Sequence, residues 1–404
     1  MAGISTSQLE LDQGKVSRFR MDRVAVIVSG HLVQDTYSAF LAPLLPSLIE
    51  KLSLSYTQAG FLSAVTQLPS LLNPFIGYLD DKLNLRIFVI LAPAVTATMM
   101  SLLGAAPTYS SLLLLLFITG LSIASFHSIS PAMIARESGD QIGKGMSLFM
   151  AAGEMGRTIG PLVAAWALLT LTMGNMFPIA IFGWIASLII FIRFRGIPIH
   201  VKKQNQLREA LPAAGRLFLP LIAIMFFRSF MITGMGVYLP TLLQGQGASV
   251  WKADISLSIY QLAGVFGAFM GGTISDRFGR KPVLFLASLL APILVLFFLN
   301  ASGWIIIPTL ILAGIFGLSS QPIMLAIVQD QLPGHRSVGN GLFMAINFIC
   351  LSVAAVAIGM LADRVSLLQA FQVTAILGLI VLPFIFWLPA PLPNANGQSP
   401  EILG

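Results

Sequence analysis

Apolar stretches of about 20 residues recur along almost the whole chain, and no other feature limits its fold as strongly. Only 10% of the residues are charged, and a soluble fold of this length could not bury 56% hydrophobic residues. The stretches do not alternate between apolar and polar residues, so they favour helices over the strands of a membrane barrel. We therefore predict an all-α membrane protein with twelve transmembrane helices, near residues 24–49, 57–79, 86–105, 109–135, 143–171, 175–195, 216–243, 252–275, 282–299, 303–329, 337–361 and 366–389.

Basic residues are divided unequally between the two sides of the membrane that these helices define. With the N-terminus inside the cell, 18 of the 23 Lys and Arg residues fall in cytoplasmic segments and three fall on the other side. Positively charged loops are retained on the cytoplasmic side, so both termini are expected there. The protein itself is expected in the inner (plasma) membrane. The apolar run that begins at Val24 is longer than a signal-peptide core, which predicts a retained first helix. The expected parts are a tail 1–23, a six-helix bundle 24–195, a linker 196–215, a second bundle 216–390 and a tail 391–404.

A short loop motif repeats between the two halves at an offset of 195 residues, where the segment 77–86 aligns with 272–281. The second copy reads G-x-x-x-D-R-x-G-R-K and lies in a very short cytoplasmic turn between two helices. Glycine permits a tight turn, and the charged residues can pair or face a helix terminus, so the cluster can hold the cytoplasmic side shut. Charge that only sets topology is the alternative. The residues assigned to this cytoplasmic gate are Gly77, Asp81, Arg86, Arg136, Gly272, Asp276, Arg277, Gly279 and Arg280.

A second motif occupies the expected fifth helix, where Gly156, Gly160 and Pro161 form a G-x-x-x-G-P pattern. Small residues four apart allow close helix packing, and proline bends the helix; simple packing is the plain interpretation. The loop motif resembles that of the major facilitator superfamily, and G-x-x-x-G-P resembles the motif of its drug:proton antiporters. The resemblance implies two pseudo-symmetric six-helix bundles that move around a central site.

Further segments resemble the fosmidomycin-resistance branch of that superfamily. They are Gly30-His31-Leu-Val-Gln-Asp35, Leu54-Ser-Tyr-Thr-Gln58-Ala-Gly60, Phe126-His127 and Gln331-Leu-Pro333-Gly334. The resemblance implies proton-coupled export of a drug-like or phosphonate-like molecule by a monomeric protein. Two departures put the substrate and the coupling chemistry in question. Ser128-Ile129 stands where that branch has Pro-Glu, and the fifth helix carries Glu154 and Arg157.

Two histidines and a carboxylate in the membrane are candidates for proton coupling. His31 and Asp35 are four residues apart in the first helix and share one of its faces. An ionised carboxylate near the helix centre is costly without a partner or water, so we predict that Asp35 and His31 bind and release a proton. A structural hydrogen-bonded pair is the alternative. For His127, in the fourth helix, a satisfied interior histidine competes with a proton relay or a substrate contact.

Charged residues in the fifth and seventh helices are candidates for substrate binding. Glu154 and Arg157 are three residues apart and can pair with each other. We predict that Arg157 binds an anionic group and that Glu154, when protonated, releases it; a structural pair is the alternative. Arg228 has no acidic residue in its own helix and needs an anion from Asp35, Glu154 or the substrate. Polar residues that join helices or line the site are Gln34, Gln261, Gln321 and Asn347.

Other classes of activity find little support. The single cysteine, Cys350, lies in an apolar run and excludes disulfides and cysteine-based metal sites. No P-loop, zinc motif or nucleophile motif is present, so we expect no enzyme activity, cofactor or metal, and no nucleic-acid partner. The leading hypothesis is a proton-coupled antiporter whose partners are a small molecule, protons and the bilayer. A proton-coupled importer of an organic anion is the first alternative, and a non-transporting membrane sensor is the second.

Overall fold

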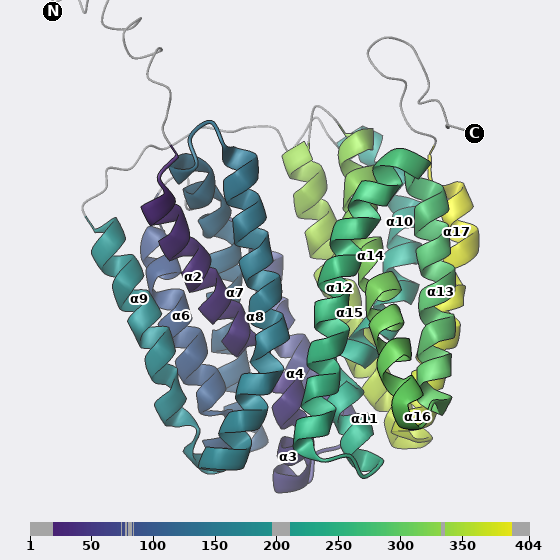
Figure 1. Cartoon of the computed structure of the whole chain (residues 1–404), viewed down its shortest axis with the longest axis horizontal. Helices are drawn as coiled ribbons and strands as arrows, with labels where there is room; N and C mark the ends of the chain where they lie inside the picture. Colours follow the sequence, from purple (N-terminus) through teal and green to yellow (C-terminus); the bar gives the residue numbers. More distant parts are fainter. Residues whose placement is uncertain are drawn as a thin grey trace, which may run out of the picture.

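The computed structural model describes residues 19–73, 75–76, 79, 83, 85–195, 211–332 and 336–389, with the backbone alone at 211–216 and 336–338. The described chain is helical and contains no strand. Its helices run side by side in two groups, one for each half of the sequence (Figure 1). The prediction of an all-α membrane fold is confirmed.

The first half consists of one broken helix followed by five further helical segments. Four of these are α6 (Arg86–Ser101), α7 (Tyr109–Glu137), α8 (Ile142–Leu171) and α9 (Ile181–Phe194). The broken helix is α2 (Met21–Ser38) with α3 (Leu41–Leu52), and the next segment is α4 (Tyr56–Gln67) with η1 (Leu68–Leu72). Short 3-10 turns occupy Leu103–Ala105, Met173–Asn175 and Phe177–Ala180.

The second half repeats this order. It begins with α10 (Leu211–Thr233), the π-helical turn η5 (Gly234–Tyr238) and α11 (Leu239–Gly245). The helices that follow are α12 (Val250–Phe278), α13 (Arg280–Asn300), η6 (Gly303–Ile305) with α14 (Ile306–Gln331), α15 (Arg336–Arg364), α16 (Leu367–Leu379) and α17 (Val381–Trp387).

Nine of the described helical stretches are long and apolar enough to cross a membrane. The other three expected spans are shorter or less apolar in the described structure, and the cause is different in each. The first is broken at Ala39 and Phe40, the second runs from η1 into residues that are only partly described, and α8 carries Lys144, Glu154 and Arg157. The structure is therefore consistent with twelve spans.

Four helices that enter from the same side begin with a hydroxyl cap, which satisfies an amide that has no partner within the helix. The side chains of Ser55, Thr108, Ser249 and Ser366 accept from the amide three residues further on. The residue that precedes each of these helices is therefore an N-cap that determines where the helix begins. We call this the capped side; the terminal side is the one at which α2 begins and α17 ends (Figure 1).

Among the described residues, the buried apolar cluster that joins the two halves lies toward the capped side. One buried cluster combines residues of both halves, such as Leu44 and Leu48 of α3 with Leu242 and Leu257. Toward the terminal side, buried apolar residues form two separate clusters: one from Val24 to Phe194 and the other from Leu217 to Leu388. The described halves thus share a core at one end, and their ribbons diverge toward the other (Figure 1).

Candidate functional site

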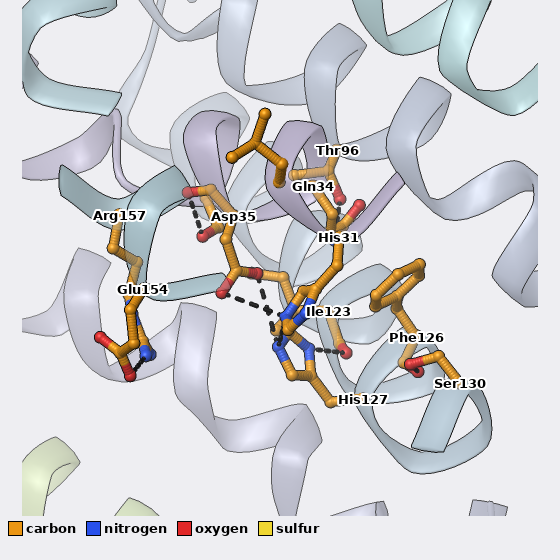
Figure 2. A network of polar contacts seen from close by, with 12 residues as sticks. His31, Gln34, Asp35, Thr96, Ile123, Phe126, His127, Ser130, Glu154 and Arg157 are labelled. Carbon is orange, nitrogen blue, oxygen red and sulfur yellow. Dashed lines mark hydrogen bonds and ion pairs between the residues drawn. The ribbon is translucent and has the colours of Figure 1, made fainter. Parts of the chain in front are cut away.

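His31 and Asp35 of α2 meet His127 of α7 inside the first half, as Figure 2 shows. The Asp35 carboxylate lies 3.5 Å from His31 Nε2 and 3.4 Å from His127 Nε2 through its two oxygens. The two Nε2 atoms are 3.2 Å apart. His31 and Asp35 are buried, whereas the His127 side chain is 33% exposed, so the cluster has one accessible member.

The opposite nitrogens of both rings fix where their hydrogens lie. His31 Nδ1 is 2.8 Å from the carbonyl of Phe149, and His127 Nδ1 is 3.0 Å from that of Ile123. A carbonyl only accepts, so both Nδ1 atoms carry hydrogen, and two neutral rings would face each other with lone pairs. The Nε2 contact therefore requires one additional proton, whose charge Asp35 balances. The candidate ligand atoms of His31, Asp35 and His127 all lie within 4.8 Å of one another, so they are close enough to bind one small cation together.

Glycines of α8 let this helix approach α2 at the level of the cluster. A Cβ at Gly153 would lie 2.5 Å from His31 Cε1, and one at Gly156 would lie 2.5 Å from the carbonyl oxygen of Leu32. A Cβ at Gly160 would lie 2.5 Å from the carbonyl oxygen of Thr36. The G-x-x-x-G-P motif is thus the face of α8 against which Asp35 is packed, and a larger residue there would displace α2.

Glu154 and Arg157 pair with each other one turn along α8, beside the histidine cluster (Figure 2). Their side chains are 31% and 44% exposed, although both lie near the middle of a transmembrane helix. An ionised pair that faced lipid at that depth would be unfavourable. Their exposure therefore indicates a water-accessible surface on α8.

Arg228 of α10 lies in the other half and is 5% exposed. Its Nε donates to Ser320 Oγ at 2.5 Å and one Nη donates to the carbonyl of Gly317 at 3.3 Å. No carboxylate pairs with it among the described residues. It also borders a small cavity that is lined by α13, α14 and α16 through Ser288, Phe316 and Gly378. A substrate contact for Arg228 remains a prediction.

The remaining predicted polar residues are distributed over both halves. Gln34 donates to Thr96 Oγ1 at 2.8 Å, and Thr96 donates to Ser122 Oγ at 2.9 Å, so Gln34 ties α2 to α6 and α7. Gln261 of α12 and Gln321 of α14 are half-buried, and Asn347 of α15 is buried. The structure therefore gives Gln34 a joining contact and leaves the substrate role of the others a prediction.

The second copy of the loop motif forms an ion-pair network within its own half. Gly279 has a φ of 90°, which glycine adopts without strain, and it makes the turn from α12 to α13. Arg280 lies 2.5 Å from Asp276, 3.1 Å from Asp330 and 2.8 Å from Ser275 Oγ. These bonds tie α12, α13 and α14 together on the terminal side.

For the other described residues assigned to the cytoplasmic gate, the structure gives positions on the helices. Gly272 is half-buried on α12, Arg277 is exposed, and Arg136 is exposed at the end of α7. Arg86 begins α6. Gly77 and Asp81 lie outside the described residues, so gating by the first copy stays a prediction.

A contact between the halves on the capped side escaped prediction. Asp363, near the end of α15, accepts from the amides of Tyr56 and Thr57 at 2.7 and 2.9 Å, and from Thr57 Oγ1 at 2.6 Å. Tyr56 and Thr57 are the first residues of α4, where amides lack partners within the helix. We call this contact the Asp363 latch. Tyr238 supports it by donating to the carbonyls of Tyr56 and Ala355 at 3.2 and 2.9 Å.

Comparisons with known proteins agree with this architecture. The chain matches the sequence model of the Major Facilitator Superfamily over residues 27–256 and 221–403. It is 26% identical over 379 residues to the fosmidomycin resistance protein of Escherichia coli K12, covering 90% of this chain and 92% of that protein. It is 27% identical to the class B tetracycline resistance protein of Escherichia coli, covering 41% and 42%. A bacterial homologue of the human lysosomal transporter Spinster, solved inward-facing and occupied, has a TM-score of 0.79 at 15% identity and covers 95% and 99%.

Proposed function

The chain belongs to the Major Facilitator Superfamily, and from that premise we propose that it exports a small anionic or drug-like molecule in exchange for protons. It is a multi-pass membrane transporter with the two-half fold that its motifs predicted. Export is supported by the names of its relatives, which confer resistance to fosmidomycin and tetracycline. The basic residues favour a cytoplasmic terminal side, so the structure would be the inward-facing state.

The close contact between His31 Nε2 and His127 Nε2 beside Asp35 is the observation that carries this proposal. Both Nδ1 atoms are committed to carbonyls, so the 3.2 Å contact between the Nε2 atoms persists only while one ring is charged. When that proton leaves, two lone pairs and a carboxylate face one another in a buried site, and this repulsion favours rearrangement. The partly exposed His127 is the route by which the proton would reach water.

The Glu154–Arg157 pair is the proposed point of substrate entry. Arg157 presents a planar guanidinium that can bind a phosphonate or carboxylate through two hydrogen bonds. An incoming anion would compete with Glu154 for Arg157 on the water-accessible surface of α8. Because α8 also packs on α2 through Gly156, an anion that moves Arg157 acts on the helix against which Asp35 lies. Substrate and proton could then be exchanged across one helix contact.

Proteoliposomes with an imposed pH gradient test this proposal. The purified protein should drive accumulation of fosmidomycin when the lumen, which receives the drug, is acidic, and Asp35→Asn should abolish gradient-driven accumulation. Asp140→Asn, which changes an exposed carboxylate in the turn after α7, is the matched control and should transport normally. Gradient-driven transport that survives in Asp35→Asn would refute proton coupling through the cluster. Accumulation in right-side-out rather than everted membrane vesicles would instead favour import.

A further inference from the structure

Asp254 of α12 is a buried carboxyl group that the proposed proton site does not use. It is 0% exposed, and neither of its oxygens has a hydrogen-bond partner among the residues that the structure describes. It lies one turn inside the capped start of α12, next to Leu257 of the apolar cluster that joins the halves. Ser258 Oγ, one turn further along the same face, also lacks a partner.

The polar groups around this position are unusual for a packed core. Thr241 Oγ1 and Gln244 Nε2 of α11, which packs on α12, are likewise buried without hydrogen bonds. Buried polar atoms are almost always paired, so unpaired ones on two adjoining helices are candidates for groups that find partners, such as water, in another conformation. Leu257 belongs to the apolar cluster between the halves, so separation of that cluster on the capped side would admit water to this junction.

No cation balances Asp254 among the described residues of its own helix or of the elements packed against it. On α12 itself, Lys252 is exposed and Arg277 lies at the terminal end. On the neighbouring helices, Lys51 of α3 donates to the carbonyls of Gly104 and Ala106, and Arg157 of α8 pairs with Glu154.

The other ionisable groups of α12 and of the elements packed against it provide no cation that pairs with Asp254 among the described residues. Glu50 of α3 is exposed, Tyr238 of η5 donates to two carbonyls, and Tyr260 of α12 is buried. The terminal-side groups are Lys144, Asp276, Arg280, Lys281 and Asp330. An ionised carboxylate without a partner is strongly disfavoured in such surroundings, so Asp254 holds its proton in this conformation.

We propose that Asp254 is a second proton-binding site, filled while the capped side is closed and emptied when that side opens to water. The site lies in the second half and is separate from the Asp35 cluster. It therefore couples the movement of the two halves to pH on the capped side, independently of which molecule is transported. The closed state binds one proton more than the open state at this position, so low pH favours closure and high pH favours opening.

Thermodynamic linkage sets the size of the effect. One proton bound in the closed state and absent from the open state changes the ratio of the two states by about tenfold per pH unit, across the pH range in which Asp254 is protonated in the closed state and ionised in the open state. Replacing Asp254 with asparagine keeps the shape of a neutral carboxyl group and removes that proton. In the Asp254→Asn variant, the tenfold change per pH unit in the ratio of the open and closed states should therefore disappear.

Distance measurements between spin labels on the capped side test the proposal without any substrate. Gly174→Cys, in the first half, and Ser302→Cys, in the second, are exposed positions; Cys350→Ser removes the native cysteine. In detergent or nanodiscs, the population with the longer distance should rise with pH. Asp254→Asn should flatten this rise, Asp254→Glu should retain it, and Asp140→Asn should leave it unchanged.

The outcomes separate this proposal from the proposed function. A pH dependence that persists in full in Asp254→Asn, or is lost in both Asp254→Asn and Asp254→Glu, overturns the second site. If Asp35→Asn keeps the part of the slope that Asp254→Asn removes, the two proton sites act separately, as proposed. Failure of gradient-driven transport would leave this measurement valid, because it requires only that the protein changes conformation.

Discussion

The Asp363 latch should set how often the capped side opens. Asp363 accepts three hydrogen bonds from the start of α4, and it is the contact through which α15 holds the other half by charge. Asp363→Asn retains one oxygen acceptor but loses the negative charge, whereas Asp363→Ala loses both. The two substitutions should therefore favour the state open on the capped side to different extents.

The magnitude follows from the geometry of a helix start. A side chain that caps a helix contributes about 1 kcal/mol, and a negative charge near an exposed N-terminus adds about 0.3–1 kcal/mol. Asp363→Asn should therefore cost the closed state about 1 kcal/mol and Asp363→Ala about 2 kcal/mol. These values correspond to roughly 5-fold and 30-fold more of the open population.

The spin-label pair at positions 174 and 302 measures this population directly at fixed pH. Thr57→Val removes one of the three donors, so the double variant Thr57→Val with Asp363→Ala should show less than the sum of the two effects. Glu50→Gln, an exposed carboxylate of α3 on the same side, is the control and should change little. If Asp363→Ala leaves the distances unchanged, the latch contributes no free energy to closure.

Two further substitutions probe the packing of each half. Gly156→Val would place side-chain carbon within 2.5 Å of the Leu32 carbonyl oxygen, so it should destabilise the protein by about 1–3 kcal/mol in thermal unfolding followed by tryptophan fluorescence. Gly143→Val, where a Cβ meets nothing within 4 Å, is the control, and equal unfolding temperatures would contradict the packing argument. Arg228→Met removes a buried cation that has no carboxylate partner in the described part of the chain, so it should leave the unfolding temperature unchanged or raised, while binding of an anionic substrate in calorimetry is lost. A large loss of stability would show that Arg228 is structural.

Sequence alone predicted the fold class because helix formation and membrane class depend on local composition. The helices lie where the apolar stretches predicted them, and the capped starts at Ser55 and Thr108 agree with hydroxyl residues just before those stretches. Spacing along one helix also placed His31 beside Asp35 and Glu154 beside Arg157. These are contacts within a few residues, which helical periodicity determines.

The contacts that escaped prediction join residues far apart in the chain. His127 completes the cluster from another helix, and nothing in the Phe126-His127 pair indicates that its Nε2 meets that of His31. In the sequence, Asp363 is an ordinary charged residue near a helix end. Its hydrogen-bond partners, Thr57 and Tyr56, are 306 and 307 residues away. Asp254 stands beside Lys252 near an expected membrane boundary, where a solvated charge is the simplest expectation. Only the packing of α12 against its neighbours shows that it is buried.

The first helix of each half is interrupted at the same point of the repeat. The first is broken at Ala39 and Phe40, and the seventh has its π-turn from Gly234, which corresponds to position 39 at the repeat offset of 195. Such irregular turns bend more easily than continuous helix, since the backbone ladder is already interrupted there. The segments beyond them, α3 and α11, pack on each other. We therefore expect the two irregular turns to be the points at which α3 and α11 change their angle to α2 and α10.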